Sequence, residues 1–372
     1  MEHKKLDLTG LNKEELFGVI SPLCENNASV RMRVSQIWDW IYTKGETDFM
    51  KMTNMSKFFR SQLIEKFIIN RPEIKSKMIS VDGTRKYLLK LFDGKLIETV
   101  YIPDKGRGTL CISSQVGCTL NCSFCYTGTQ NLVRNLSSSE IVQQLMIVRD
   151  DLKEWEGLKE TKGKTRSISN IVLMGMGEPL YNFEAVKKGL AIIMDETGIS
   201  ISRKRITLST SGVVPRIESV GKEIGCLLAI SFHATTDDVR DKLVPINKKW
   251  NIKSLLDALR SYPTLSNSER ITFEYVMIED INDSTEDARR LVNLISGIPS
   301  KINLIPFNPW PGSNFKPSTQ NKIEEFSKII NLAGYSSPVR TPRGQDIMAA
   351  CGQLKSISKR IKKSHINVER EI

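Results

Sequence analysis

Three cysteines stand close together in the segment Cys118-Thr-Leu-Asn-Cys122-Ser-Phe-Cys125. Cysteine thiolates are the usual ligands of a cubane [4Fe–4S] cluster, which normally takes four of them. Three cysteines at this spacing supply three ligands and leave one iron open to a small molecule. Zinc would need a fourth protein ligand, and no histidine lies nearby in the sequence. The segment therefore predicts an iron–sulfur centre held by Cys118, Cys122 and Cys125.

The chain offers few other groups for such chemistry. Of its three histidines, His3 and His365 lie near the termini, so only His233 is well placed inside a fold. The seven cysteines are an odd number in a long chain, which argues against a secreted framework of disulfides. We therefore expect the reaction to depend on cysteine, carboxylate or a cofactor rather than on a histidine-based triad.

The elements that position the cysteines follow from the pattern of apolar residues. From about residue 108 onward, apolar runs typical of strands alternate with helical patterns, which predicts βα units and a parallel sheet. Helices are expected near 137–152, 184–195, 252–261, 284–296 and 318–333. Strands are expected at Thr109–Ser113, Ile171–Met174, Arg205–Leu208, Leu227–Ser231, Ile271–Met277 and Lys301–Ile305. Ligands of such folds gather at the carboxyl ends of the strands.

Two different patterns precede the βα series. Residues 1 to about 70 are predicted to be helical, with a first amphipathic run around 34–42 and a second from Met55 to Ile68. Residues 74–103 hold the turn dipeptides Asp82-Gly83 and Asp93-Gly94 between apolar runs, which predicts a β-meander. The polar stretch Trp155–Ser169 is predicted to be an insertion loop, and a basic tail is expected after Leu354.

Composition limits the class of protein. The chain has 372 residues, 40% of them hydrophobic, which excludes disorder for the bulk. No run approaches the roughly 18 apolar residues of a membrane span, and the N-terminus lacks the apolar core of a signal peptide, which predicts a cytoplasmic protein without membrane contact. The net charge of +12 favours a polyanionic partner such as nucleic acid, although a merely basic protein would carry the same charge.

The cysteine spacing, with an aromatic residue before the last cysteine, is the signature of radical S-adenosylmethionine (SAM) enzymes. In such enzymes the open iron chelates the amino and carboxylate groups of SAM and passes it an electron. The segment Gly175-Met-Gly-Glu178-Pro179 follows an apolar strand and fits a SAM site. Its glycines let the backbone approach a ligand, and Glu178 can accept hydrogen bonds from the SAM ammonium group.

Six longer motifs, in order along the chain, resemble the RlmN family of radical SAM RNA methyltransferases, which place a methyl group on adenine C2. The resemblance spans about residues 30 to 354 and is much more specific than the cysteine spacing alone. The motifs are Cys111-Ile-Ser-Ser-Gln-Val-Gly-Cys118, Gly175-Met-Gly-Glu-Pro179, Leu208-Ser-Thr-Ser-Gly212, Ile230-Ser-Phe-His-Ala234, Asn303-Leu-Ile-Pro-Phe-Asn308-Pro and Ala350-Cys351-Gly-Gln-Leu.

The resemblance implies an α/β fold, a partial (βα)6 TIM-like radical SAM barrel at 108–343. A helical RNA-binding domain at 1–72 and a β-meander linker at 73–107 would precede the barrel. A C-terminal segment at 344–372 would carry a catalytic cysteine and the basic tail.

The resemblance also implies how the residues act. Cys351 would take a methyl group from one SAM, and a radical from a second SAM would remove hydrogen from that S-methyl group. The methylene radical would add to adenine C2, Glu98 would remove the C2 proton, and Cys111 would release the product by forming a disulfide with Cys351. Cofactor-binding positions implied by the family are Gly177, Glu178, Pro179, Ser209, Ser231, Phe232, His233 and Asn308.

The implied partners are 23S rRNA near the peptidyl-transferase centre, the tRNA anticodon loop and a flavodoxin-type electron donor, with the chain as a monomer. A target adenine must be unstacked to reach a buried cluster. The basic loops at 202–205, 247–250 and 340–343 are candidate RNA contacts.

Three alternatives stay open. The first is the related resistance-type enzyme that methylates adenine C8, against which Glu178-Pro179 argues. The second is a non-catalytic RNA-binding protein with a structural iron–sulfur cluster. The third is a radical SAM enzyme for a small molecule or peptide, which would leave the basic N-terminal module unexplained.

Overall fold

The computed structural model describes residues 5–155, 166–263, 269–356 and 358. Parallel strands form its centre, and their order in the sheet equals their order in the chain. This is the arrangement of an open barrel built from successive βα units, and it confirms the six strands expected from the sequence. They are β6 (Arg107–Cys111), β9 (Asn170–Leu173), β10 (Ile206–Thr210), β11 (Leu227–Ser231), β12 (Ile271–Met277) and β13 (Ser300–Pro306).

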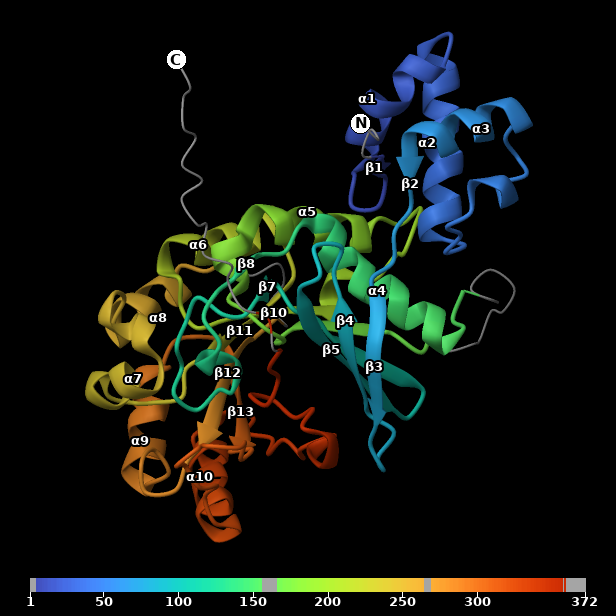
Figure 1. The fold of residues 1–372 in the computed structure, drawn as a ribbon. Helices are drawn as coiled ribbons and strands as arrows, with labels where there is room; N and C mark the ends of the chain where they lie inside the picture. The colour runs from blue at the N-terminus through green and yellow to red at the C-terminus, as the bar shows by residue number, and fades with distance from the viewer. Residues whose placement is uncertain (1–4, 156–165, 264–268, 357, 359–372) are drawn as a thin grey trace, which may run out of the picture.

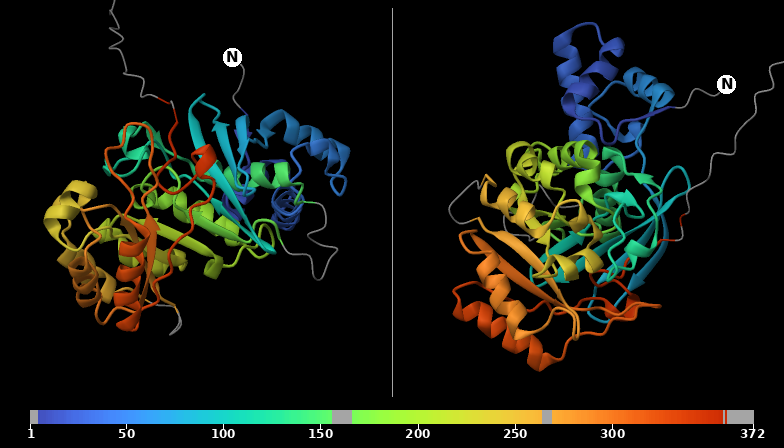
Figure 2. Two further views of the ribbon diagram at one scale, coloured as in Figure 1. Left: turned by 90° about the horizontal axis from the view of Figure 1, so that it is seen from below. Right: turned by 90° about the vertical axis from the view of Figure 1, so that its left-hand side faces the viewer.

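Helices connect these strands and cover the outer face of the curved sheet (Figure 1; Figure 2). They are α4 (Ser138–Leu152), α5 (Phe183–Met194), α6 (Val214–Ser219), α7 (Asp237–Leu243), α8 (Ile252–Arg260), α9 (Thr285–Leu294) and α10 (Gln320–Leu332). The sequence pattern missed α6 and α7, because six and seven residues are too few to show a helical period. Pro215 in the first turn of α6 further obscures it.

The predicted meander is present and continues the barrel sheet. Its strands are β3 (Glu73–Ile79), β4 (Arg85–Lys90) and β5 (Leu96–Asp104). β5 pairs antiparallel with β6, so one sheet of nine strands runs from β3 to β13. Val100 pairs with Cys111 and therefore shares a face of the sheet with it. Glu98, two residues before Val100, points to that same face.

The N-terminal helices α1 (Lys13–Ile20), α2 (Asn27–Tyr42) and α3 (Lys57–Lys66) form a small group beside the barrel, blue in Figure 1. The second helical run is shorter than expected, since α3 ends at Lys66 and Phe67–Ile68 forms β2. This strand pairs in parallel with β1 (Leu6–Asp7), and its aromatic and β-branched residues favour extended chain. Lys13 pairs with Asp195 at 2.7 Å and ties the group to the end of α5.

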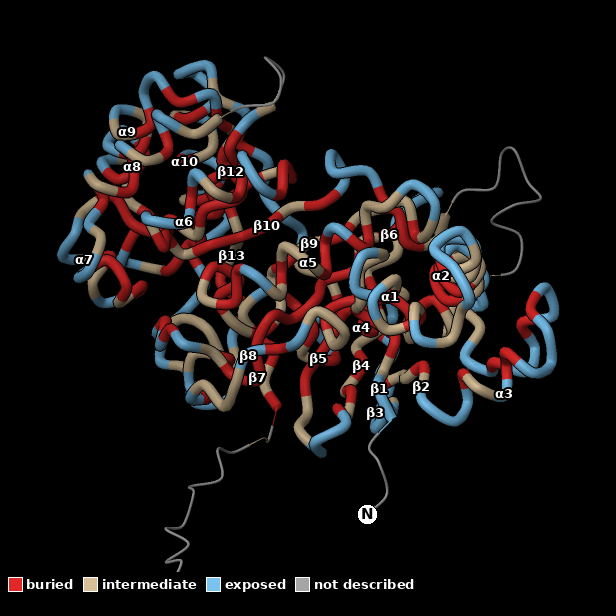
Figure 3. Tube along the Cα trace, turned by 90° about the horizontal axis from the view of Figure 1, so that it is seen from above, coloured by how far each residue is buried: buried red, intermediate tan, exposed pale blue. Residues whose placement is uncertain are grey.

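Burial follows the layers of the fold (Figure 3). The barrel strands are mostly buried, and the outer faces of the helices are exposed. Within the described ranges, no helix is long and apolar enough to cross a membrane. Residues 156–165 of the predicted insertion loop and 359–372 of the predicted basic tail lie outside the described residues.

Candidate active site

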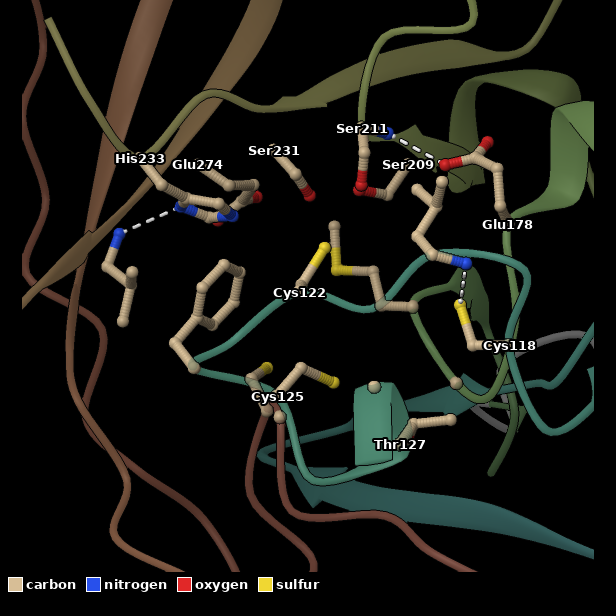
Figure 4. A pocket seen from close by; sticks show the side chains of 18 of the residues that line it. Cys118, Cys122, Cys125, Thr127, Glu178, Ser209, Ser211, Ser231, His233 and Glu274 are labelled. Carbon is tan, nitrogen blue, oxygen red and sulfur yellow. Dashed lines mark hydrogen bonds between the residues drawn. The ribbon is translucent and has the colours of Figure 1, made fainter. Parts of the chain in front are cut away.

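The three clustered cysteines lie on the loop between two short strands, β7 (Gln115–Val116) and β8 (Arg134–Asn135), which pair with each other. All three side chains line one cavity, together with residues that follow barrel strands (Figure 4). The loop turns at Gly117, whose φ of +78° and whose close approach to the Asn131 carbonyl leave no room for a Cβ.

The donor set fits a cluster better than a single ion. Across the described residues, no three His, Cys, Asp or Glu side chains stand close enough to hold one metal ion. Each cysteine of a cubane binds a different iron, so its ligands lie farther apart than those of one ion. The Leu120 N–H donates to Cys118 Sγ at 3.3 Å, the kind of main-chain contact that stabilises a thiolate. Desolvation raises the pKa of all three thiols, so bound iron would be needed to keep them ionised.

Glu178 lies at the end of β9 and lines the same cavity (Figure 4). Its Oε1 accepts the Leu180 N–H at 3.1 Å and its Oε2 accepts the Ser211 N–H at 2.8 Å. Burial nevertheless raises the pKa of this carboxyl to about 7. Gly177 has a φ of +100°, and a Cβ there would lie 2.5 Å from the Gln115 side chain, so the turn requires glycine. Pro179 is buried in the short 3-10 turn that follows and does not line the cavity.

Ser209, Ser231, His233 and Asn308 all line the cavity, as Figure 4 shows for the first three. His233 Nδ1 accepts the Val276 N–H at 3.0 Å, so the ring proton resides on Nε2. Burial, with a contribution from the nearby Arg240 charge, lowers the pKa of His233 to about 3. The neutral ring is therefore a hydrogen-bond donor for a ligand in the cavity.

Phe232 differs from the other expected cofactor positions. It is fully buried, packs edge-on against Phe273 at 5.4 Å between ring centroids, and does not line the cavity. Its carbonyl accepts a hydrogen bond from Arg240 at 3.0 Å. Arg240, which the sequence analysis missed, is fully buried and also donates to the carbonyls of Ser211 and Ser231. It thereby fixes the chain at the ends of β10 and β11.

Glu274 is a second residue that the sequence analysis missed. It lies on β12, is buried and lines the cavity. Its Oε1 accepts from Asn303 at 2.9 Å and lies 3.4 Å from the Arg340 guanidinium, whereas its Oε2 is buried without a hydrogen-bond partner. A buried acceptor with no protein donor fits a ligand that supplies one, such as a ribose hydroxyl or an ammonium group. A carboxylate within a strand of mostly apolar residues was the signal available in the sequence.

Cys351 stands between this cavity and a second one, and it lines both. Cys111, on β6, lines the second cavity together with Val100, Arg340 and Arg343. Burial raises the pKa of Cys111 to about 12, and the neighbouring Cys351 contributes to that shift. Both cysteines are free thiols, so the disulfide expected during turnover is not formed here.

Glu98 lies next to the second cavity, on the strand face that Val100 and Cys111 share. The carboxylate is buried and accepts the Lys355 N–H at 2.9 Å on Oε2, while Lys86 Nζ lies 3.3 Å from Oε1. Burial raises the pKa of Glu98, an effect that Lys86 and the Lys355 N–H oppose.

This fold and cavity define a radical SAM enzyme, and comparison with known proteins supports that class. The model of the radical SAM superfamily matches residues 112–292, and a model described as the ribosomal RNA large subunit methyltransferase N-terminal domain matches residues 6–69. A crystal structure of a radical SAM methyltransferase from Sphaerobacter thermophilus superposes with a TM-score of 0.85 at 37% identity, covering 94% of this chain and 99% of that one.

Relatives named dual-specificity RNA methyltransferase RlmN match nearly the whole chain. One from Cereibacter sphaeroides is 61% identical, over 98% of this chain and 93% of its own length. One from Dinoroseobacter shibae is 61% identical, over 100% of this chain and 94% of its own. The chain belongs to the RlmN family of radical SAM RNA methyltransferases, whose cofactors are a [4Fe–4S] cluster and SAM.

Proposed function

We propose that this enzyme methylates C2 of a specific adenine in 23S rRNA and in the tRNA anticodon loop, through a methyl group carried on Cys351. The observation that carries the proposal is the position of Cys351 in the wall between two cavities. One cavity holds the three clustered cysteines and the other holds Cys111. A thiol in this place can take up a methyl group from a ligand in the first cavity and transfer that carbon to a substrate in the second.

The first cavity is proposed to hold both cofactors. Cys118, Cys122 and Cys125 would bind the cluster. Glu178, Ser209, Ser231, His233 and Asn308 would bind SAM, with Gly177 allowing close approach and Pro179 and Phe232 shaping the surrounding chain. Bound together, the two cofactors supply one-electron chemistry able to remove hydrogen from an unactivated methyl group.

The second cavity is proposed to take the unstacked adenine. Arg340 and Arg343 at its wall are partly exposed and would bind the adjoining phosphates. Glu98 would accept the C2 proton, and because burial raises its pKa, the carboxylate is a stronger base than a solvated one. Cys111, as a thiolate, would then attack the Cys351 sulfur and form a disulfide with it. The carbon–sulfur bond would break with its electron pair left on the methylene carbon, which would take up a proton to become the methyl group of the product.

The proposed partners are RNA, bound in part by the N-terminal helices, and an electron donor. The N-terminal helices would contact RNA outside the target nucleotide, because their family model is that of a ribosomal RNA methyltransferase domain. A flavodoxin-type donor would reduce the cluster. The domain limits at 72, 107 and 343, the monomeric state and the cytoplasmic location stay predictions.

Mass spectrometry tests the proposal. Anaerobically reconstituted enzyme would receive methyl-labelled SAM, a reductant and undermodified RNA. We expect label on Cys351 and 2-methyladenosine in the RNA digest, and a trapped protein–RNA adduct with Cys111→Ala. Cleavage of SAM without label on Cys351 would overturn the methyl-carrying role, and 8-methyladenosine would instead identify the resistance-type activity.

A further inference from the structure

Lys86 is a mostly buried cation of the meander for which the proposed chemistry has no role. It lies on β4, and its side chain is 11% exposed. Its Nζ lies 3.3 Å from Glu98 Oε1 and donates to the Met348 carbonyl at 3.1 Å. Lys86 pairs with Val100 across the strands, so it lies diagonally beside Glu98 on the face that borders the second cavity.

Glu98 links Lys86 to the chain segment that follows Cys351. While its Oε1 faces Lys86, its Oε2 accepts the Lys355 N–H at 2.9 Å. Met348 precedes Cys351 in the chain and Lys355 follows it. The Lys86–Glu98 ion pair of the meander therefore contacts both ends of the loop that carries the Cys351 thiol.

The loop needs such support because its own backbone is irregular. Met348 has a φ of +55°, a conformation that residues with a side chain seldom adopt unless the surroundings impose it. Beyond Lys86, the meander also fixes the approach to the loop, since Asp82 accepts the Gly344 N–H at 3.0 Å.

We propose that Lys86 is a positioning residue that holds the Glu98 carboxylate and the Cys351 loop in fixed relation across the second cavity. The proposal rests on the function proposed above, in which Glu98 accepts the C2 proton while Cys351 is joined to C2 through the methylene group. Glu98 and the carbon bound to Cys351 belong to separate chain segments, so the distance between them must be held constant. Lys86 contacts both segments.

Lys86 also acts on the charge of Glu98. Of the groups that lower the Glu98 pKa against the effect of burial, the Lys86 charge is the largest and the Lys355 N–H the next. Met176 Sδ and Ser113 Oγ contact the Glu98 main chain from the barrel side and carry no charge. Replacing Lys86 with a neutral residue would therefore raise the Glu98 pKa further, and the base would be protonated over a wider pH range.

The first experiment uses amide hydrogen exchange on cofactor-free protein to test whether Lys86 holds the Cys351 loop in place. Lys86→Met removes the charge at similar length, and Lys90→Met is the matched control, because Lys90 lies on the same strand but pairs with Glu73 at the surface. We expect exchange in the peptide spanning 349–355 to rise at least tenfold in Lys86→Met and to stay unchanged in Lys90→Met. Wild-type protection in Lys86→Met would overturn the proposal.

The action on Glu98 is tested by the pH profile of 2-methyladenosine formation with reconstituted enzyme. In Lys86→Met the acid limb should move up by about one pH unit, the low end of the effect of a neighbouring opposite charge. Lys86→Arg, which keeps the charge, should retain the wild-type limb. A uniform loss of rate at every pH would overturn the role. If the wild type itself makes no methyladenosine, the proposed function fails. The exchange experiment would still show whether Lys86 holds the Cys351 loop in place.

Discussion

Asn308 donates a hydrogen bond from its side-chain amide to the main-chain carbonyl of Cys351, with the two atoms 3.1 Å apart. Its Oδ1 accepts from the Gln345 side chain, also at 3.1 Å. Asn308 follows β13, so the chain at the end of the last barrel strand is hydrogen-bonded to the C-terminal loop at Cys351 and at Gln345. A residue that the family resemblance assigns to the cofactor therefore also fixes Cys351, the proposed methyl carrier.

We expect Asn308→Ala to weaken both the fold and the loading of Cys351. The variant loses two part-buried hydrogen bonds, which would cost about 1–3 kcal/mol of the free energy of unfolding. Urea unfolding of cofactor-free protein measures this cost, and mass spectrometry measures the rate at which Cys351 gains a methyl group. Asn293→Ala, an exposed position on α9, serves as the control. Unchanged stability together with an unchanged loading rate would contradict the structural role.

Replacing Cys118 with alanine should abolish the cluster that leaves one iron open. Two remaining thiolates cannot hold a cubane that already lacks its fourth protein ligand. Iron content and electron paramagnetic resonance of the reconstituted protein measure the loss. Cys226→Ala is the control, because Cys226 is buried outside the cavity, and that variant should keep the cluster. A full complement of iron in Cys118→Ala would show that the ligands lie elsewhere.

His233 should make the fold sensitive to acid. Its pKa is about 3 in the folded protein and about 6.5 in an unfolded chain, so below pH 6.5 protons bind preferentially to the unfolded state. Its contribution is fully present above pH 6.5 and declines as the pH falls toward 3. His233→Asn removes the titration, keeps an oxygen acceptor and suits the φ of +59° at this position.

The comparison between the two proteins isolates the histidine from other titrating groups. The urea midpoint of the cofactor-free wild type should fall more between pH 7.5 and pH 5 than that of His233→Asn. Parallel pH dependence in the two proteins would show that His233 is not buried in its neutral form.

The arginines at the wall of the second cavity should control RNA affinity. Arg340→Met combined with Arg343→Met would remove the cations that bind up to two phosphates. The plot of log affinity against log salt should flatten by about one for each phosphate that is no longer bound. Filter binding at several salt concentrations measures this slope, with Lys253→Met on the outer helix α8 as the control. A lower affinity with an unchanged slope would place these arginines away from phosphate.

Sequence and structure agree where the signal is local. The strand pattern, the turns at Gly83 and Gly94 and the cysteine spacing each depend on neighbouring residues, and the structure contains all of these elements. The roles of Glu274 and Arg240 depend instead on contacts with other elements of the fold. Nothing in one strand shows that a carboxylate oxygen will lack a donor or that a guanidinium will bind three carbonyls. The sequence also does not show that Ser231 and His233 line the cavity while the ring of Phe232 between them packs against Phe273 in the core.

The pairing of β5 with β6 has a consequence for how this enzyme could be divided or recombined. In a fragment that began at Arg107, β6 would be an unpaired edge strand that could pair with strands of other chains. It would also lack Glu98, Lys86 and Asp82, and with them the contacts between the meander and the C-terminal loop. The helical group ahead of β3 is the simpler unit for exchange between relatives, whereas the meander can be exchanged only together with the segment around Cys351.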